Sequence, residues 1–157
     1  FPKNKDGCIL LNKLYTTAKT KNNGFLDFEI INEIWDNDSL KMSIPFYDSF
    51  IFNNNLKFSN CVPDLSHVSP SFFIEENGLP FDLIIKREVL KFCDDAKLNN
   101  FHCKSIYYNN RKDFDAYTTY KCICNRKKFM SSLDKPNFDH LGSREFSFES
   151  WKEGQLV

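Results

Sequence analysis

The sequence predicts an α+β fold in which one or two helices pack on a mixed sheet. The main observation is a strand-helix-strand-strand order over residues 81–124, where apolar runs flank one amphipathic segment. The composition agrees with a globular chain, because 41% of the residues are hydrophobic and 27% are charged. A length of 157 residues fits a single domain, 1–157.

The N-terminal part predicts one helix, followed by a segment that fits two templates. Apolar residues at positions 10, 11, 14 and 15 recur at helical intervals, so we expect a helix over residues 8–18. In residues 24–35, apolar positions 26, 28 and 30 alternate as in a strand. Positions 28, 31, 34 and 35 of the same segment recur as in a helix, so both structures stay open.

The middle of the chain predicts a strand and then a loop. Residues 41–52 are rich in aromatic and β-branched side chains around Pro45, which favours an edge or bent strand because proline cannot donate to a sheet. Residues 61–70 contain two prolines and several small polar residues, so they predict a loop and the best candidate for a soft domain boundary. The sequence starts at Phe1 rather than Met, which is typical of a fragment or a processed chain.

The clearest unit lies in the second half. Residues 81–85 form an apolar run that predicts a strand, and residues 86–98 predict a helix that ends at two asparagines. Residues 101–108 and 114–124 then predict two further strands. Four residues share one helical stripe that we expect to pack on the sheet: Val89, Leu90, Cys93 and Ala96.

Charge and cysteine content exclude several classes of function. The 21 basic residues balance 21 acidic ones, so we expect no nucleic-acid partner, and we interpret Arg126-Lys127-Lys128 as a solvated turn. No apolar run is long enough to span a bilayer, so we expect no membrane partner. Six cysteines are too sparse for a disulfide scaffold, and the Cys-x-Cys pair at 122 and 124 lacks zinc-knuckle spacing. We expect reduced thiols, a cytoplasmic location, no metal and no cofactor.

Constellations typical of catalysis are weak. Asp64, Ser66 and His67 are adjacent in a predicted loop, which favours turn-forming roles over a catalytic triad. Asp64 with Glu75 and Lys86 matches the permissive acidic-and-lysine pattern of a metal-dependent nuclease. A small metal-dependent nuclease-like toxin or effector enzyme therefore stays open as an alternative.

A candidate binding surface lies at residues 35–38, where Trp35 adjoins Asp36 and Asp38. Aromatic residues are enriched at interface hot spots, and acidic residues would attract a basic partner. A core tryptophan beside a surface turn is the other interpretation of the same residues.

Residues 81–134 resemble a bacterial family of immunity proteins from polymorphic toxin systems. The resemblance lies in the order of its pieces: an apolar strand, an amphipathic helix, an asparagine turn, a strand, and an aromatic-rich strand that leads to a Leu-Asp pair. In this sequence they are Leu83-Ile84-Ile85, residues 86–98, Asn99-Asn100, residues 101–108, residues 117–124 and Leu133-Asp134.

The resemblance implies a cytoplasmic protein that binds and blocks a cognate toxin protein and has no catalytic residues. We therefore expect an immunity-type binding protein that neutralises its toxin by stoichiometric binding, with Trp35, Asp36 and Asp38 in the contact surface.

Overall fold

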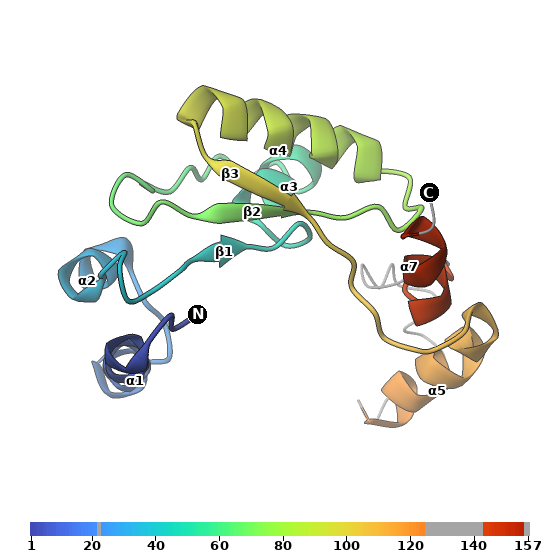
Figure 1. The fold of residues 1–157 in the computed structure, drawn as a ribbon, viewed down its shortest axis with the longest axis horizontal. Helices are drawn as coiled ribbons and strands as arrows, with labels where there is room; N and C mark the ends of the chain where they lie inside the picture. The colour runs from blue at the N-terminus through green and yellow to red at the C-terminus, as the bar shows by residue number, and fades with distance from the viewer. Residues whose placement is uncertain (22, 125–142, 156–157) are drawn as a thin grey trace. The chain divides into compact units, whose positions relative to one another are not determined.

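The computed structural model describes residues 1–21, 23–124 and 143–155 (Figure 1). Contacts within the chain divide it into two compact units. Unit 1 comprises Phe1–Phe73 and Glu88–Phe101, and unit 2 comprises Ile74–Arg87 and His102–Val157. The Leu133-Asp134 pair and Arg126-Lys127-Lys128 lie outside the described residues.

The predicted α+β class is confirmed, since helices accompany a small sheet. Within the described part of the chain the sheet has three strands in the order β1-β2-β3: Ser43–Ile44, Ser71–Ile74 and Asn99–His102. β1 and β2 run parallel, with Ser43 opposite Ser71 and Ile44 opposite Phe72. The sequence predicted a mixed sheet, whereas the strands form a parallel one.

Unit 1 begins with two helices that lie side by side, α1 (Lys5–Lys21) and α2 (Phe28–Ile34) (Figure 1). The predicted helix at 8–18 is confirmed, and the ambiguous segment 24–35 is helical from Phe28 to Ile34. Asp27 favours the helix over the strand in this segment, because its carboxylate caps α2 by accepting from the Ile30 amide at 2.9 Å. Leu14, Ile34 and Leu40 form a buried cluster, against which four partly buried residues pack: Leu10, Ile30, Ile31 and Trp35.

The strand predicted over residues 41–52 is much shorter than expected, since β1 is confined to Ser43–Ile44. Pro45 follows it directly, and Ser49 then caps α3 (Phe50–Leu56) by accepting from the Phe52 amide at 3.2 Å. Phe52 is fully buried from a helix rather than from a strand. Residues 61–70 are largely irregular, as the prolines predicted.

The strand predicted at residues 81–85 is wrong, because this segment forms the first turns of α4 (Asp82–Ala96). Helical spacing buries Ile85, Val89 and Cys93 and leaves Leu83 76% exposed. In the predicted stripe, Val89 and Cys93 are buried as expected. Leu90 is half-buried and Ala96 is exposed, so the stripe lies one helical turn earlier than predicted.

The two strands predicted after this helix are also corrected. β3 starts at the asparagines expected to form a turn and ends at His102. Residues 114–124 form a helix, α5 (Phe114–Cys124), after the 3-10 turn η1 (Arg111–Asp113). Its buried side chains recur every four residues: Phe114, Thr118 and Cys122. The described residues end with helix α7 (Phe148–Gly154), which Ser147 caps.

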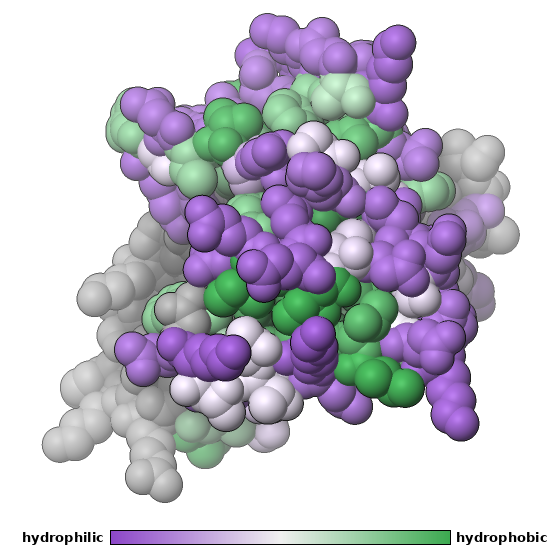
Figure 2. Space-filling model, turned by 90° about the vertical axis from the view of Figure 1, so that its left-hand side faces the viewer, coloured by the Kyte–Doolittle hydropathy of each residue, from purple (hydrophilic) through white to green (hydrophobic). Residues whose placement is uncertain are grey.

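Many large apolar side chains remain at the surface. In unit 1 they include Ile9, Tyr15 and Phe25, each at least 60% exposed. A space-filling view shows hydrophobic residues gathered within a largely hydrophilic surface (Figure 2). None of the described helices combines the length and apolar character needed to cross a bilayer.

Candidate functional site

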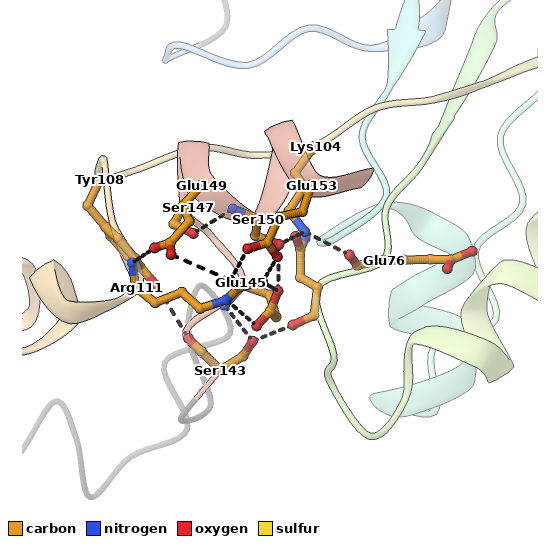
Figure 3. Close-up of polar contacts among 11 residues, drawn as sticks. Glu76, Lys104, Tyr108, Arg111, Ser143, Glu145, Ser147, Glu149, Ser150 and Glu153 are labelled. Atoms are coloured by element: carbon orange, nitrogen blue, oxygen red, sulfur yellow. Dashed lines mark hydrogen bonds and ion pairs between the residues drawn. The ribbon is translucent and has the colours of Figure 1, made fainter. Parts of the chain in front are cut away.

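The densest polar cluster in unit 2 is centred on Arg111 (Figure 3). Arg111 lies in η1. Its guanidinium donates from Nε and Nη2 to the two oxygens of the Glu145 carboxylate, both at 3.0 Å. Its Nη1 and Nη2 also donate to Glu153 of α7, at 3.0 and 2.7 Å. The Arg111 backbone amide donates to Glu149 Oε2 at 2.8 Å. One arginine therefore fixes three carboxylates.

These contacts keep the cluster ionised. Hydrogen bonds from Arg111 hold the pKa of Glu145 and of Glu153 below the ordinary glutamate value. The same bonds, with Glu153 first and Glu145 second, raise the pKa of Arg111. A general acid or base needs a pKa near the working pH, so these groups are poorly suited to proton transfer. The geometry is that of a structural clamp on α7.

Lys104 adjoins this clamp from the segment after β3. Its Nζ donates to Ser150 Oγ at 2.8 Å and to the Glu76 carbonyl at 3.2 Å. Burial lowers the pKa of Lys104, and the nearby Glu145 carboxylate partly offsets that effect. Glu75 is buried but well satisfied, since its carboxylate accepts from the Ser105 amide and hydroxyl at 2.9 and 3.0 Å.

A hollow of about 320 Å³ opens beside Lys104. Its lining includes Glu76, His102, Cys103 and Trp151. A cysteine next to a histidine suggests nucleophilic chemistry, which requires a thiolate. Cys103 is exposed, but partial desolvation of its thiol, with the Glu75 charge as a smaller cause, raises the pKa of Cys103 to about 11. The thiol therefore stays protonated near neutral pH.

The residues predicted to bind a partner lie together on the turn that follows α2 in unit 1. Trp35 is half-buried against the Leu14 cluster, and its Nε1 donates to Asn37 Oδ1 at 2.9 Å. The Asp36 carboxylate accepts from the Asp38 amide at 3.0 Å. The Ser39 hydroxyl and then the Asp38 amide hold the pKa of Asp36 below its usual range. Asp38 itself is exposed.

Asn37 ties this turn to two other segments of unit 1. Its carbonyl accepts from Lys3 Nζ at 2.6 Å, and its Nδ2 donates to the His67 carbonyl at 2.9 Å. Sequence reasoning selected the neighbours of Asn37 for their charge and aromaticity and did not identify Asn37. A polar side chain at the centre of an acidic turn was the signal that could have found it.

Comparisons with known proteins do not assign a family. No protein-family model matches the chain, and no curated protein matches it.

The residues of the nuclease-like pattern are each engaged elsewhere. Asp64 accepts from the Ser66 amide at 3.0 Å, which makes a local turn. Glu75 accepts from Ser105, and Lys86 pairs with Glu76. In the part of the chain that the structure describes, no group of three or more His, Cys, Asp or Glu side chains could hold a metal ion.

Proposed function

We propose that the protein is an immunity-type binding protein that neutralises a cognate bacterial toxin in the cytoplasm by stoichiometric binding. The observation that carries this proposal is the preformed turn at residues 35–39. Its indole, amide and carboxylate groups are fixed by hydrogen bonds before any partner arrives. A prearranged loop loses little conformational entropy on association, which favours tight binding.

The chemistry of the turn favours a basic partner. Asp36 is held ionised by its hydrogen bonds, and Asp38 presents its carboxylate to solvent. The half-buried Trp35 ring supplies a rigid apolar surface beside these charges. Acidic groups next to an aromatic anchor accelerate encounter with a basic protein and supply a hot spot for the complex.

The polar cluster of unit 2 supports binding over turnover. Arg111 saturates its neighbouring carboxylates, and the Cys103 thiol is held in its protonated form. An effector enzyme would need such groups poised to exchange protons or to attack a substrate. The carboxylates that Arg111 binds hold α7 in place instead.

The test is a titration with the protein encoded by the neighbouring gene. We expect the two proteins to copurify, and protection of cells from that protein's toxicity to scale with their molar ratio. Protection that is complete at strongly substoichiometric amounts would reject the binding mechanism, as would the absence of any protection.

The turn itself is tested by Asp38→Lys. The substitution reverses an exposed charge whose side chain does not hold the turn together, so the fold should persist while toxin binding weakens at least tenfold, on the order of 1.4 kcal/mol. Asp115→Lys is the matched control, because Asp115 is an exposed acid in the first turn of α5 in unit 2. Equal affinities for the two variants, measured by calorimetry, would remove the turn from the interface. Asp36 is unsuitable for this test because its carboxylate shapes the turn.

A further inference from the structure

We infer that unit 1 carries a small-molecule site in the hollow between the loop of residues 63–69 and the C-terminal end of α4. Its ligand is an α-amino acid with a large apolar side chain. The site goes beyond the proposed function, because none of its lining residues belongs to the turn at residues 35–39.

The loop of residues 63–69 forms one wall of the hollow, and hydrogen bonds hold its irregular backbone in shape. The Asp64 carboxylate accepts from the Ser66 amide at 3.0 Å, and the Val68 amide donates to the Leu65 carbonyl at 3.2 Å. Val68 is 1% exposed and anchors the loop in the core of the unit. This wall therefore exists before any ligand binds, as is usual for small-molecule sites.

The end of α4 forms the opposite wall and places a lysine there. Lys97 follows the helix directly, with φ at +55°. Its amide donates to the Asp94 carbonyl at 3.3 Å, and the Leu98 amide donates to the Cys93 carbonyl at 2.8 Å. This pattern closes a helix end in the way that glycine normally serves. A lysine in this conformation costs backbone strain, and such positions cluster where a side chain has a function.

The hollow between these walls has the size and the apolar lining of a ligand site. Its volume is about 380 Å³, which lies within the usual range for small-molecule sites. Phe92 is held by aromatic contacts, since the ring centroids of Phe50 and Phe72 lie 5.3 and 5.5 Å from its own. Five apolar residues line the hollow: Pro63, Leu65, Phe92, Ala96 and Leu98.

Two opposite charges accompany the apolar lining, one from each wall. The Ser66 backbone amide and then its hydroxyl hold the pKa of Asp64 below its usual value, with His67 as a minor cause, so this carboxylate is ionised at neutral pH. Lys97 supplies the positive charge. In the part of the chain that the structure describes, no ion pair or hydrogen bond joins Asp64 to Lys97.

Unpaired charges of opposite sign select a zwitterion. A ligand with a single charge would attract one of the two groups and repel the other, whereas a zwitterion offers an ammonium group to Asp64 and a carboxylate to Lys97. An α-amino acid carries both groups on one carbon together with its side chain. It can therefore direct its charges to these residues and its side chain to the apolar lining.

The site is tested by NMR titration of the full chain with L-phenylalanine. Each of three controls lacks one recognised group: phenethylamine has no carboxylate, hydrocinnamate has no ammonium group, and L-alanine has no large side chain. We expect saturable shifts of the Leu65 and Leu98 methyl signals with L-phenylalanine. Every control should bind more weakly by about threefold or more, since exposed charge pairs contribute modest energies. No saturable binding of L-phenylalanine, or equal binding of all four compounds, would overturn the site.

Two neutral variants assign the charges. Asp64→Asn keeps an oxygen that can accept from the Ser66 amide, so the loop should persist. We expect this variant to bind L-phenylalanine more weakly by about threefold or more and to bind hydrocinnamate as wild type does. Lys97→Gln should weaken L-phenylalanine to a similar extent and leave phenethylamine unchanged. Unchanged affinity for the analogue that lacks the lost contact also shows that each variant is folded.

Asp6→Asn and Lys91→Gln are the matched controls, because both residues are exposed on helices of unit 1 and neither lines the hollow. Both should bind L-phenylalanine as wild type does. Unchanged binding of L-phenylalanine in both Asp64→Asn and Lys97→Gln would overturn the inference. Equal weakening of L-phenylalanine and of its singly charged analogues in these variants would show a structural effect and would overturn it as well.

Discussion

Tyr108 is a residue of unit 2 whose ionisation depends on its burial. Burial, with the Glu145 charge as a smaller cause, raises the pKa of Tyr108 to about 12. The hydroxyl lies 3.5 Å from the Ser143 carbonyl, so a neutral phenol donates where a phenolate could not.

We therefore expect a loss of stability at alkaline pH. A raised pKa in the folded state means that the contribution is fully present below the unfolded value near 10 and disappears as the pH rises towards 12. Over that range the free energy of unfolding should fall by on the order of 2 kcal/mol. Urea unfolding of wild type and Tyr108→Phe at pH 9 and about pH 12 measures the difference, which should be smaller for the variant. Parallel pH profiles would contradict this role.

Individual residues were predicted from sequence only where their chemical type determined their place. The prolines of residues 61–70 interrupt regular structure as predicted, whereas the helix caps Asp27 and Ser49 were not predicted. The exposed Phe58 could not have been predicted, because aromatic side chains normally predict burial and nothing local reveals its positive φ. Trp35 packs against the Leu14 cluster beside a surface turn, and its contact with a partner stays a prediction.

At the scale of elements, α4 offers a direct test of helix against strand. In a strand, Leu83 and Ile85 would share one face, whereas the helix leaves Leu83 76% exposed and buries Ile85 completely. We expect Ile85→Ala to lower the free energy of unfolding by about 2–5 kcal/mol. Leu83→Ala, the matched control, should change it by less than about 0.5 kcal/mol. Both free energies are measured by urea unfolding. Similar losses of unfolding free energy in the two variants would indicate a strand instead of a helix.

The elements that sequence reasoning missed share one cause. Short apolar runs such as Leu83-Ile84-Ile85 fit a buried strand and a buried helix equally well. The deciding contacts come from outside the run: the Asp82 carboxylate accepts from the amides of Asn77 and Leu79, at 2.8 and 3.0 Å, and so fixes the start of α4. Before α5, the Asn110–Asp113 capping box closes the 3-10 turn η1, which leads directly into a segment rich in tyrosine and threonine.

At the scale of the whole molecule, the Arg111 clamp predicts sensitivity to acid. Glu145 has a lowered pKa in the folded state, chiefly because Arg111 donates to it. Its contribution is fully present above the ordinary glutamate pKa and disappears as the pH falls through the lowered value. Glu145→Gln should therefore be less stable than wild type at neutral pH and lose less stability on acidification.

Thermal unfolding followed at pH 7 and about pH 3 measures this difference. Glu33→Gln serves as the control, because Glu33 is an exposed glutamate of α2. A Glu145→Gln variant with the wild-type pH profile would show that the clamp does not contribute to stability.

The candidate sites show how far sequence reasoning extends across the molecule. The acidic turn was predicted because its residues are consecutive. The Arg111 cluster draws on residues from 76 to 153, and the hollow at the end of α4 combines residues from 63 to 98. Their composition depends on long-range packing, for which a single sequence carries no signal. The fold class could be predicted from the sequence because it depends only on which kinds of element occur.

Helix α4 contributes Asp82–Arg87 to unit 2 and the rest of its length to unit 1, so each unit is assembled from two separate stretches of chain. A gene fusion or recombination event with one crossover cannot separate the two units, because any single cut that keeps one unit whole divides the other. Evolution can therefore exchange neither unit as a simple cassette. New surface properties would have to arise by substitution at exposed positions, such as Asp38, while the whole chain is inherited together.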